Sequence, residues 1–199
     1  MSTNDLRVRH LITEEAARII LDEGVIDYGL AKRKAAERLG AAQTRNLPRN
    51  AEIDDAVRAR QRLFDDDSRR TELLRLRTVA LDAMNLLEPF EPRLVGPVLE
   101  GVVNGRDEVT LHVFADSVEE VIFHLEDRGI RWRGEERRLR TAQGHTAYPV
   151  VVFPGPAAQV EAVVFPVKGI RQAPQSPVDG RPMRRAGIRE VRGLLGGGK

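Results

Sequence analysis

The feature that most constrains the fold is a change of hydrophobic period at Pro92. Before Pro92, apolar residues recur at helical spacing, which is typical of amphipathic helices. After Pro92, apolar and polar residues alternate in most apolar segments, which is typical of half-buried strands. We therefore expect an α+β protein in which helices come first and a small mixed sheet with helices follows.

The first part of the chain predicts several helices. Thr13, Asp27 and Asn50 each carry a side chain that can cap the N-terminus of a helix. A longer helix ends before Pro89, and its apolar residues form one stripe: Leu73, Leu76, Ala80, Met84 and Leu87. We assign residues 1–88 to a helical section.

The second part predicts a sheet. Five segments have the alternation and the β-branched residues of strands, at 94–98, 109–114, 138–142, 147–153 and 160–167. Ser117 can cap a helix between the second and third of these, and Gly129 can end it. Residues 89–170 thus form an α+β section, and residues 171–199 an extended arm with a short C-terminal helix.

Composition narrows the functional classes. The chain is 41% apolar and 31% charged, which suits a folded protein. It contains no cysteine, so disulfides, thiolate metal sites and a cysteine nucleophile are excluded. Its apolar runs are too short to cross a membrane, and its N-terminus lacks the apolar core of a secretory signal. We expect a cytoplasmic protein with no membrane partner.

The basic residues are unusual because 28 of the 32 are arginine. A guanidinium group holds phosphate or carboxylate with two hydrogen bonds, which an ammonium group cannot do. Ion pairing with the 30 acidic residues is the simpler explanation, and the net charge is only +2.

The segment from Arg93 to Asp116 predicts a candidate site. It reads as a short strand, a glycine turn, a loop and a second strand. Side chains two positions apart on a strand share a face, so we expect a polar cleft made by Gly96, Glu108, Thr110, His112 and Glu161. His112 would act there as an acid, a base or a ligand contact. The alternative, which we favour, is that this face is simply exposed to water.

The order strand, glycine turn, strand, helix, strand, strand resembles the nucleotidyltransferase fold of the DNA polymerase β type. In that family an apolar residue and Gly-Ser are followed, after about ten residues, by acid-x-acid on a strand and by a third acid on a later strand. Gly96-Pro97 matches the Gly-Ser position, Glu108 to Thr110 match acid-x-acid, and Glu161 matches the third acid. The resemblance implies a nucleotide site, and it covers about Arg93 to Val167.

This sequence departs from the family pattern at two positions. Pro97 replaces a serine whose hydroxyl would contact phosphate, and Thr110 replaces the second acid. Two Mg²⁺ ions need several carboxylate oxygens. The resemblance therefore implies a degenerate member that binds a nucleotide or another phosphate-bearing ligand without efficient catalysis. An active enzyme that holds one Mg²⁺, with help from Asp107 or Asp116, is the alternative, and we assign no catalytic residue.

The chain is also similar to an uncharacterised proteobacterial family with stretches such as LAKRKAAERLG, LPRNAEI, EPRLVGPVLEG and PVDGRPMRRA. Some members are labelled nucleotidyltransferases, and others are labelled Mur-type ligases. The ligase label finds no support here, because no glycine-rich phosphate loop ending in Gly-Lys-Ser or Gly-Lys-Thr is present.

The arm contains a second candidate site. In VDGRPMRR, a turn and a rigid proline accompany Arg181, Arg184 and Arg185. These residues would fold back on the sheet and bind an anion. A tail held by surface acids is an equal alternative.

Two further hypotheses use the helices and need no enzyme. The segment YGLAKRKAAERLG resembles the first helix of a helix-turn-helix, and its basic residues would meet nucleic-acid phosphate. The loop that follows it is longer than the usual turn. Alternatively, the helix from Arg69 to Leu87 forms the seam of a homodimer. The histidines at positions 10, 124 and 145 have no metal-ligand spacing, so we assign no metal site.

Overall fold

The computed structural model describes residues 3–63, 67–106, 108–142 and 144–196. The chain divides into two compact units. The N-terminal unit comprises Met1–Asp67, Val102–Arg106 and Pro177–Asp179. The sheet unit comprises Ser68–Gly101, Asp107–Ser176 and Gly180–Lys199. Among the helices of these described residues, none has the length and hydrophobicity to cross a membrane.

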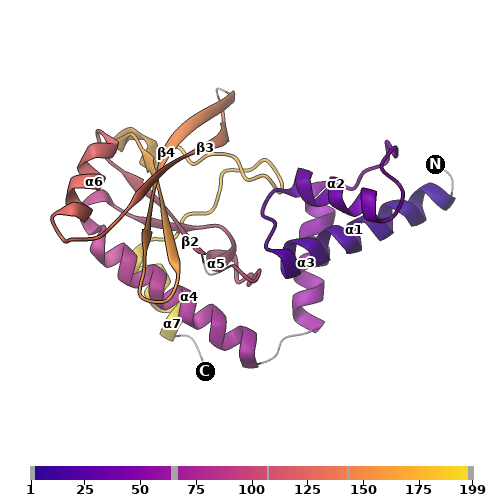
Figure 1. Cartoon of the computed structure of the whole chain (residues 1–199), viewed down its shortest axis with the longest axis horizontal. Helices are drawn as coiled ribbons and strands as arrows, with labels where there is room; N and C mark the ends of the chain where they lie inside the picture. Colours follow the sequence, from indigo (N-terminus) through magenta and orange to yellow (C-terminus); the bar gives the residue numbers. More distant parts are fainter. Residues whose placement is uncertain (1–2, 64–66, 107, 143, 197–199) are drawn as a thin grey trace. The chain divides into compact units, whose positions relative to one another are not determined.

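The N-terminal unit is built from α1 (Thr3–Glu23), α2 (Tyr28–Arg38) and α3 (Asn50–Leu63), coloured indigo to violet in Figure 1. Asp27 caps α2 as predicted, because its carboxylate accepts the Leu30 N–H at 2.7 Å. The three helices and the segment Val102–Arg106 share one buried apolar cluster, which includes Ile12, Ile19, Ala35, Ile53, Val57 and Val102.

The prediction that Thr13 starts the first helix is wrong. α1 begins at Thr3, and Thr13 lies in its middle. There its hydroxyl donates to the carbonyl of Arg9 at 2.9 Å, a contact that threonine makes inside helices. The sequence around Thr13 does not distinguish a threonine that caps a helix from a threonine that lies inside one.

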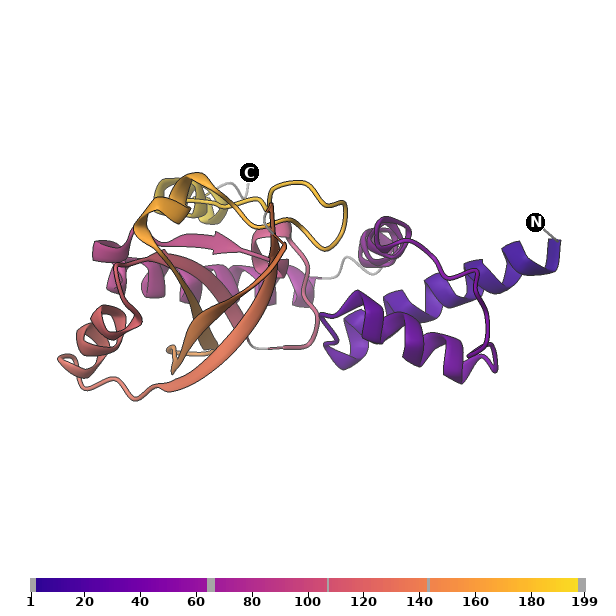
Figure 2. The ribbon, with the colours of Figure 1, turned by 90° about the horizontal axis from the view of Figure 1, so that it is seen from above.

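The sheet unit contains five strands, drawn as arrows in Figures 1 and 2: β1 (Arg93–Val95), β2 (Glu108–Phe114), β3 (Arg133–Thr141), β4 (Gly144–Pro154) and β5 (Gln159–Phe165). Their order in the sheet is β1-β2-β5-β4-β3. β2 and β5 are parallel, and the other neighbours are antiparallel. The α+β class, with helices at the N-terminus and a mixed sheet, is thus confirmed.

One face of the sheet, the helix face, packs against α4 (Asp67–Leu86), α6 (Val118–Glu126) and α7 (Ile188–Gly196). The buried cluster there includes Leu76, Met84, Leu111, Val121, Ala162 and Val191. The apolar stripe of α4 is therefore used inside the chain. A homodimer seam on this helix stays a prediction, although Leu76 and Met84 of the stripe are at most 1% exposed within the single chain.

The first strand is shorter than predicted. β1 ends at Val95, and Gly96 follows with a φ of 72°, a left-handed value that favours glycine. Pro97 then occupies the first turn of the short helix α5 (Pro97–Glu100), where its missing N–H is not needed. The apolar residues up to Val98 therefore belong to a turn and a helix rather than to one strand.

The β3–β4 hairpin is longer than predicted, since the expected strands started only at 138 and 147. Arg133 to Thr141 pair along their whole length with residues of β4. β3 is an edge strand with a mostly exposed surface, so its charged residues carry little of the apolar alternation that marks a strand.

β5 is followed by the 3-10 helix η2 (Val167–Arg171) and then by the arm, which is drawn gold to yellow in Figures 1 and 2. The arm returns to the open edge of β1. Leu94 and Ala186 exchange two backbone hydrogen bonds, of 2.8 and 3.0 Å. Both side chains lie in the cluster of the helix face. Because extended residues alternate, the neighbouring Arg185 faces the opposite side of the sheet, which we call the arm face.

Candidate functional site

Four of the five predicted cleft residues lie on the arm face. Glu108, Thr110 and His112 alternate along β2 with the buried residues of the helix face. Glu161 lies on β5 directly opposite Thr110. Gly96 follows Val95, the β1 partner of Thr110. The fold therefore brings all five to neighbouring positions, although Thr110 and Glu161 are 51 positions apart in the sequence.

Glu161 is a buried carboxylate with partners inside the chain. Its exposed fraction is 6%. One carboxylate oxygen, Oε2, accepts a hydrogen bond from Arg137 Nη2 at 2.8 Å and another from the Thr110 hydroxyl at 3.3 Å. Arg137 comes from β3, and its guanidinium neutralises the charge that a metal ion would otherwise balance.

His112 is buried, with an exposed fraction of 1%. Its Nδ1 accepts a hydrogen bond from Arg185 Nε at 3.0 Å, so the neutral ring carries its proton on Nε2. Burial, together with the charges of Arg185 and Arg137, lowers the pKa of His112 to about 3. At neutral pH the ring is therefore uncharged and cannot act as a general acid in its imidazolium form. The hypothesis of a face simply exposed to water is wrong for this residue.

Arg185 is the least compensated charge on the arm face. Its Nη1 donates to the carbonyls of Gly169 and Ile170, at 2.9 and 3.3 Å. Its Nη2 is buried without any hydrogen-bond partner. Within the described part of the chain, no carboxylate pairs with this guanidinium. Burial and the charge of Arg93 lower the pKa of Arg185 to about 10, so it stays cationic at neutral pH.

Aromatic rings surround this guanidinium. Arg185 Cζ lies 5.1 Å from the ring centroid of Phe114 and 4.9 Å from that of Phe165. Phe165 also contacts His112 and Tyr148, with ring centroids 4.5 and 4.3 Å away. Sequence reasoning missed these rings. Alternation along β5 was the available signal, because it places Phe165 on the same face as Glu161.

The other two arginines predicted to bind an anion lie elsewhere. Arg184 forms an ion pair with Glu190 at 2.6 Å and lies 4.0 Å from Glu100. Arg181 is exposed and follows a turn at Gly180, and its backbone carbonyl accepts the Ser176 N–H at 2.7 Å. Arg185, in contrast, donates a hydrogen bond to His112 on the arm face.

The residues at this site do not fit a pair of Mg²⁺ ions. Thr110 and Pro97 supply no carboxylate, and Glu161 is engaged by Arg137. Asp107 lies outside the described residues, and Asp116 is exposed beyond the end of β2. Within the described ranges, no three acidic or histidine side chains are grouped to hold a metal. We therefore derive no step through a metal ion.

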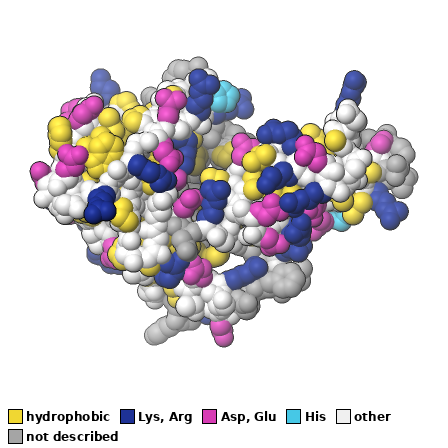
Figure 3. All heavy atoms as spheres, in the orientation of Figure 1, with side chains coloured by type: hydrophobic (Ala, Val, Ile, Leu, Met, Phe, Trp, Pro, Cys, Tyr) yellow, Lys and Arg dark blue, Asp and Glu magenta, His cyan; other side chains and the backbone are white. Residues whose placement is uncertain are grey.

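The basic side chains of α2 are partly neutralised within the N-terminal unit. Arg38 pairs with Glu15 at 3.2 Å and with Glu23 at 2.5 Å, and Lys34 pairs with Glu23 at 3.3 Å. Over these helices, Figure 3 shows basic and acidic side chains intermixed on the visible face. Nucleic-acid binding by this helix stays a prediction, and these ion pairs weaken its electrostatic basis.

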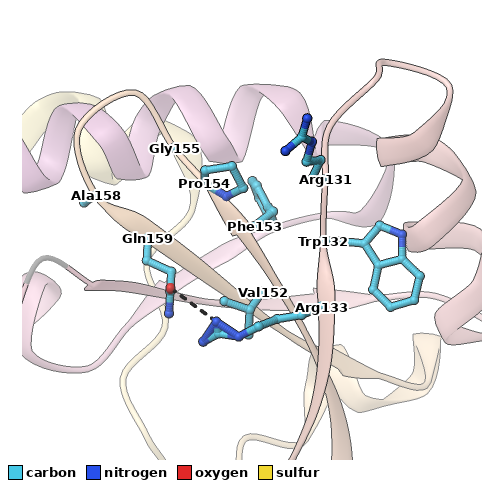
Figure 4. A pocket seen from close by; sticks show the side chains of 9 residues that line it. All are labelled: Arg131, Trp132, Arg133, Val152, Phe153, Pro154, Gly155, Ala158 and Gln159. Carbon is cyan, nitrogen blue, oxygen red and sulfur yellow. Dashed lines mark hydrogen bonds between the residues drawn. The ribbon is translucent and has the colours of Figure 1, made fainter.

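A pocket of about 340 Å³ lies where β3, β4 and β5 meet at one end of the sheet (Figure 4). Its lining includes Arg131, Arg133, Val152, Phe153 and Gln159, and none of the predicted site residues. Sequence reasoning missed it. The available signal was the only tryptophan of the chain, Trp132, between two arginines.

Comparison of the chain with protein-family models, with curated proteins and with solved structures finds no significant match. The properties of the site therefore rest on its own residues.

Proposed function

We propose that this chain is a nucleotidyltransferase-like protein that binds a nucleotide or another phosphate-bearing ligand on the arm face without efficient catalysis. The observation that carries the proposal is Arg185, a half-buried side chain whose Nη2 is buried without a hydrogen-bond partner and which has no carboxylate partner among the described residues. A buried polar group without a partner is costly, and an anion at this position would satisfy it.

The arrangement of elements supports the nucleotidyltransferase part of the proposal. Gly96 starts a helix directly after the first strand, and Glu108 and Thr110 follow on the neighbouring strand. Glu161 lies beside Thr110 on the next strand of the sheet. Under this proposal, these residues correspond to the family's glycine turn, paired acids and third acid.

Charge also favours an anionic ligand. Arg93 pairs with Glu91 and Arg137 with Glu161, so each of these arginines has a carboxylate nearby. Arg185 adds a further positive charge near Arg93. The side chains of Arg93 and Arg137 are 28% and 27% exposed, so a phosphate group would approach through these partly exposed arginines.

The loss of catalysis follows from the carboxylates. Phosphoryl transfer with two metal ions needs several acidic oxygens around the reacting phosphate. On the arm face, Thr110 and Pro97 stand at two of the family's polar positions, and Glu161 holds Arg137. Binding without turnover is the function that remains.

Thermal unfolding with ATP, AMP and inorganic phosphate tests the proposal, each with and without Mg²⁺. We expect at least one phosphate compound to raise the melting temperature of the wild-type chain, because a ligand that binds the folded state stabilises it. Arg185→Gln should abolish the shift, whereas Arg185→Lys should retain part of it.

Arg184→Gln is the matched control, because it removes the same charge from the adjacent position, where Glu190 is the partner. It should leave the shift unchanged. Each shift is measured against the same variant without ligand, so a loss of intrinsic stability does not affect the comparison. A wild-type chain that no phosphate compound stabilises would contradict the proposal.

A further inference from the structure

We propose that the pocket between β3, β4 and β5 binds a small organic anion, made of a carboxylate or phosphate attached to a flat apolar body. This site is separate from the arm-face residues discussed above, since none of those residues lines it. Its volume, about 340 Å³, falls in the range of small-ligand sites.

The first argument is charge. Within the described part of the chain, Arg131 has no ion pair or hydrogen bond to an acidic group. Arg133 pairs with Glu135 at 2.9 Å, so its charge is balanced. The pocket therefore presents one uncompensated guanidinium, which favours an oxyanion.

The second argument is the supply of hydrogen-bond donors. Arg133 Nη1 donates to the amide oxygen of Gln159 at 3.4 Å, a contact drawn in Figure 4. The amide nitrogen of Gln159 makes no hydrogen bond to the residues that the structure describes, so it remains a donor. A site rich in donors selects a ligand rich in acceptors, which carboxylate and phosphate both are.

The third argument is the shape of the pocket. The lining also includes the exposed apolar side chains of Trp132 and Pro154, which give the pocket an apolar wall. Gly155 lies in the β4–β5 turn, where its N–H donates to the carbonyl of Ala158 at 2.8 Å. A Cβ atom there would lie 2.8 Å from that same oxygen and 2.9 Å from Val79, so only glycine fits at this point of the lining.

Phenyl phosphate and benzoate are suitable probes, because each joins a flat ring to one of the two oxyanions. Inorganic phosphate and phenol each supply one half of the chemistry. By calorimetry we expect phenyl phosphate or benzoate to bind with a Kd on the order of 1 mM or tighter. We expect both half-probes to bind at least about tenfold more weakly.

Trp132 provides a second readout, since it is the single tryptophan of the chain. It lines the pocket between Arg131 and Arg133, and its Nε1–H donates to the Glu126 carboxylate at 3.0 Å. Binding should shift its one indole N–H signal in a ¹H–¹⁵N spectrum, at the probe concentrations where heat is released.

Arg131→Gln should weaken the tighter probe by about tenfold, because it removes a charge-assisted hydrogen bond. Arg128→Gln is the matched control, because Arg128 is an exposed arginine whose Nη1 contacts the His124 carbonyl on α6 and which does not line the pocket. It should leave the affinity unchanged, as should Arg185→Gln.

Three results would overturn the proposal. The first is no binding of phenyl phosphate or benzoate at roughly ten times the expected Kd. The second is equal binding of inorganic phosphate and phenyl phosphate, since the apolar wall would then contribute nothing. The third is the same affinity in the Arg131 and Arg128 variants.

Discussion

At the scale of single residues, the contact between His112 and Arg185 joins two basic groups at 3.0 Å. It is favourable only while the imidazole is neutral, because a protonated ring would have no lone pair at Nδ1 and would repel the guanidinium. The contact therefore links the protonation of one buried side chain to the position of the arm.

This linkage gives a pH prediction. The pKa of His112 is about 3 in the folded chain against an ordinary value of 6.5. Between these values the unfolded chain binds a proton that the folded chain does not bind. The free energy of unfolding should fall as pH is lowered below 6.5, by up to about 1.4 kcal/mol per pH unit from this residue. Above pH 6.5 His112 contributes no pH dependence.

Chemical denaturation of wild type and His112→Gln between pH 4.7 and 6.5 measures the effect. The lower limit lies above the ordinary glutamate pKa of 4.5, and the upper limit is the ordinary histidine pKa of 6.5. Glutamine keeps an acceptor for Arg185 but does not titrate, so the variant should lose most of the slope. Glu15 and Glu52, whose pKa values are lowered by their arginine partners to about 2, act mainly below this interval and are the same in both proteins. Parallel slopes in the two proteins would refute this assignment.

At the scale of elements, α4 shows how a helix pattern is resolved by packing. The sequence correctly predicts that Leu76, Ala80 and Met84 are buried, since they are at most 1% exposed, but it missed Val79 and Ala83. It does not indicate what covers them. The helix would need the same apolar stripe to pack on a sheet of its own chain or on a second copy of the chain. Only the three-dimensional fold distinguishes these two alternatives.

Two leucines of α4 allow a matched test. Leu76 is 1% exposed and Leu74 is 37% exposed. Leu76→Ala should lower the free energy of unfolding by roughly 2–5 kcal/mol, because it leaves a cavity in the core. Leu74→Ala should cost less than about 1 kcal/mol. Urea titration of both variants measures the difference, and equal losses would mean that α4 does not pack on the sheet as described.

The strands illustrate the same limit in another form. β2 and β5 were predicted to within one or two residues, because both strands are largely buried and are therefore rich in apolar, β-branched residues. β3 was predicted too short, since five charged residues occupy its first six positions. An edge strand is hydrogen-bonded to one neighbouring strand only. Its own sequence therefore gives little indication of that pairing.

At the scale of the whole molecule, the chain returns to its N-terminal unit after the helices are complete. Val102 is 8% exposed and belongs to the same buried cluster as Ile12 and Ile53. The carbonyl of the next residue, Val103, accepts a hydrogen bond from Gln61 at 3.2 Å. The N-terminal unit therefore needs a segment that lies between two elements of the sheet unit.

We accordingly expect Val102→Ala to speed hydrogen exchange in α1, α2 and α3 by about tenfold, since removing two methylene-sized groups from a core costs roughly 1–2 kcal/mol. The strand amides should be unaffected. Val167→Ala is the control, because Val167 is 49% exposed and lies in the sheet unit. An effect confined to the strands would disprove this role of Val102.

The candidate site could be predicted only in part. Alternation along β2 correctly placed Thr110 beside His112, and the parallel pairing with β5 then brought Glu161 next to them. The partners of these residues come from β3 and the arm, as Arg137 and Arg185. No local pattern in the sequence encodes contacts across that many residues, so the burial of His112 could not be foreseen.

The parallel pairing of β2 and β5 has a consequence for biosynthesis. Thr110 cannot contact Glu161, 51 positions further along the chain, until that residue has been synthesised. Leu94 likewise cannot pair before Ala186 has been synthesised. While a ribosome makes the intervening residues, the nascent chain carries strand edges with unmet hydrogen bonds, which attract other unfinished chains. The open edge of β1 therefore has its backbone partner only after Ala186 has been synthesised.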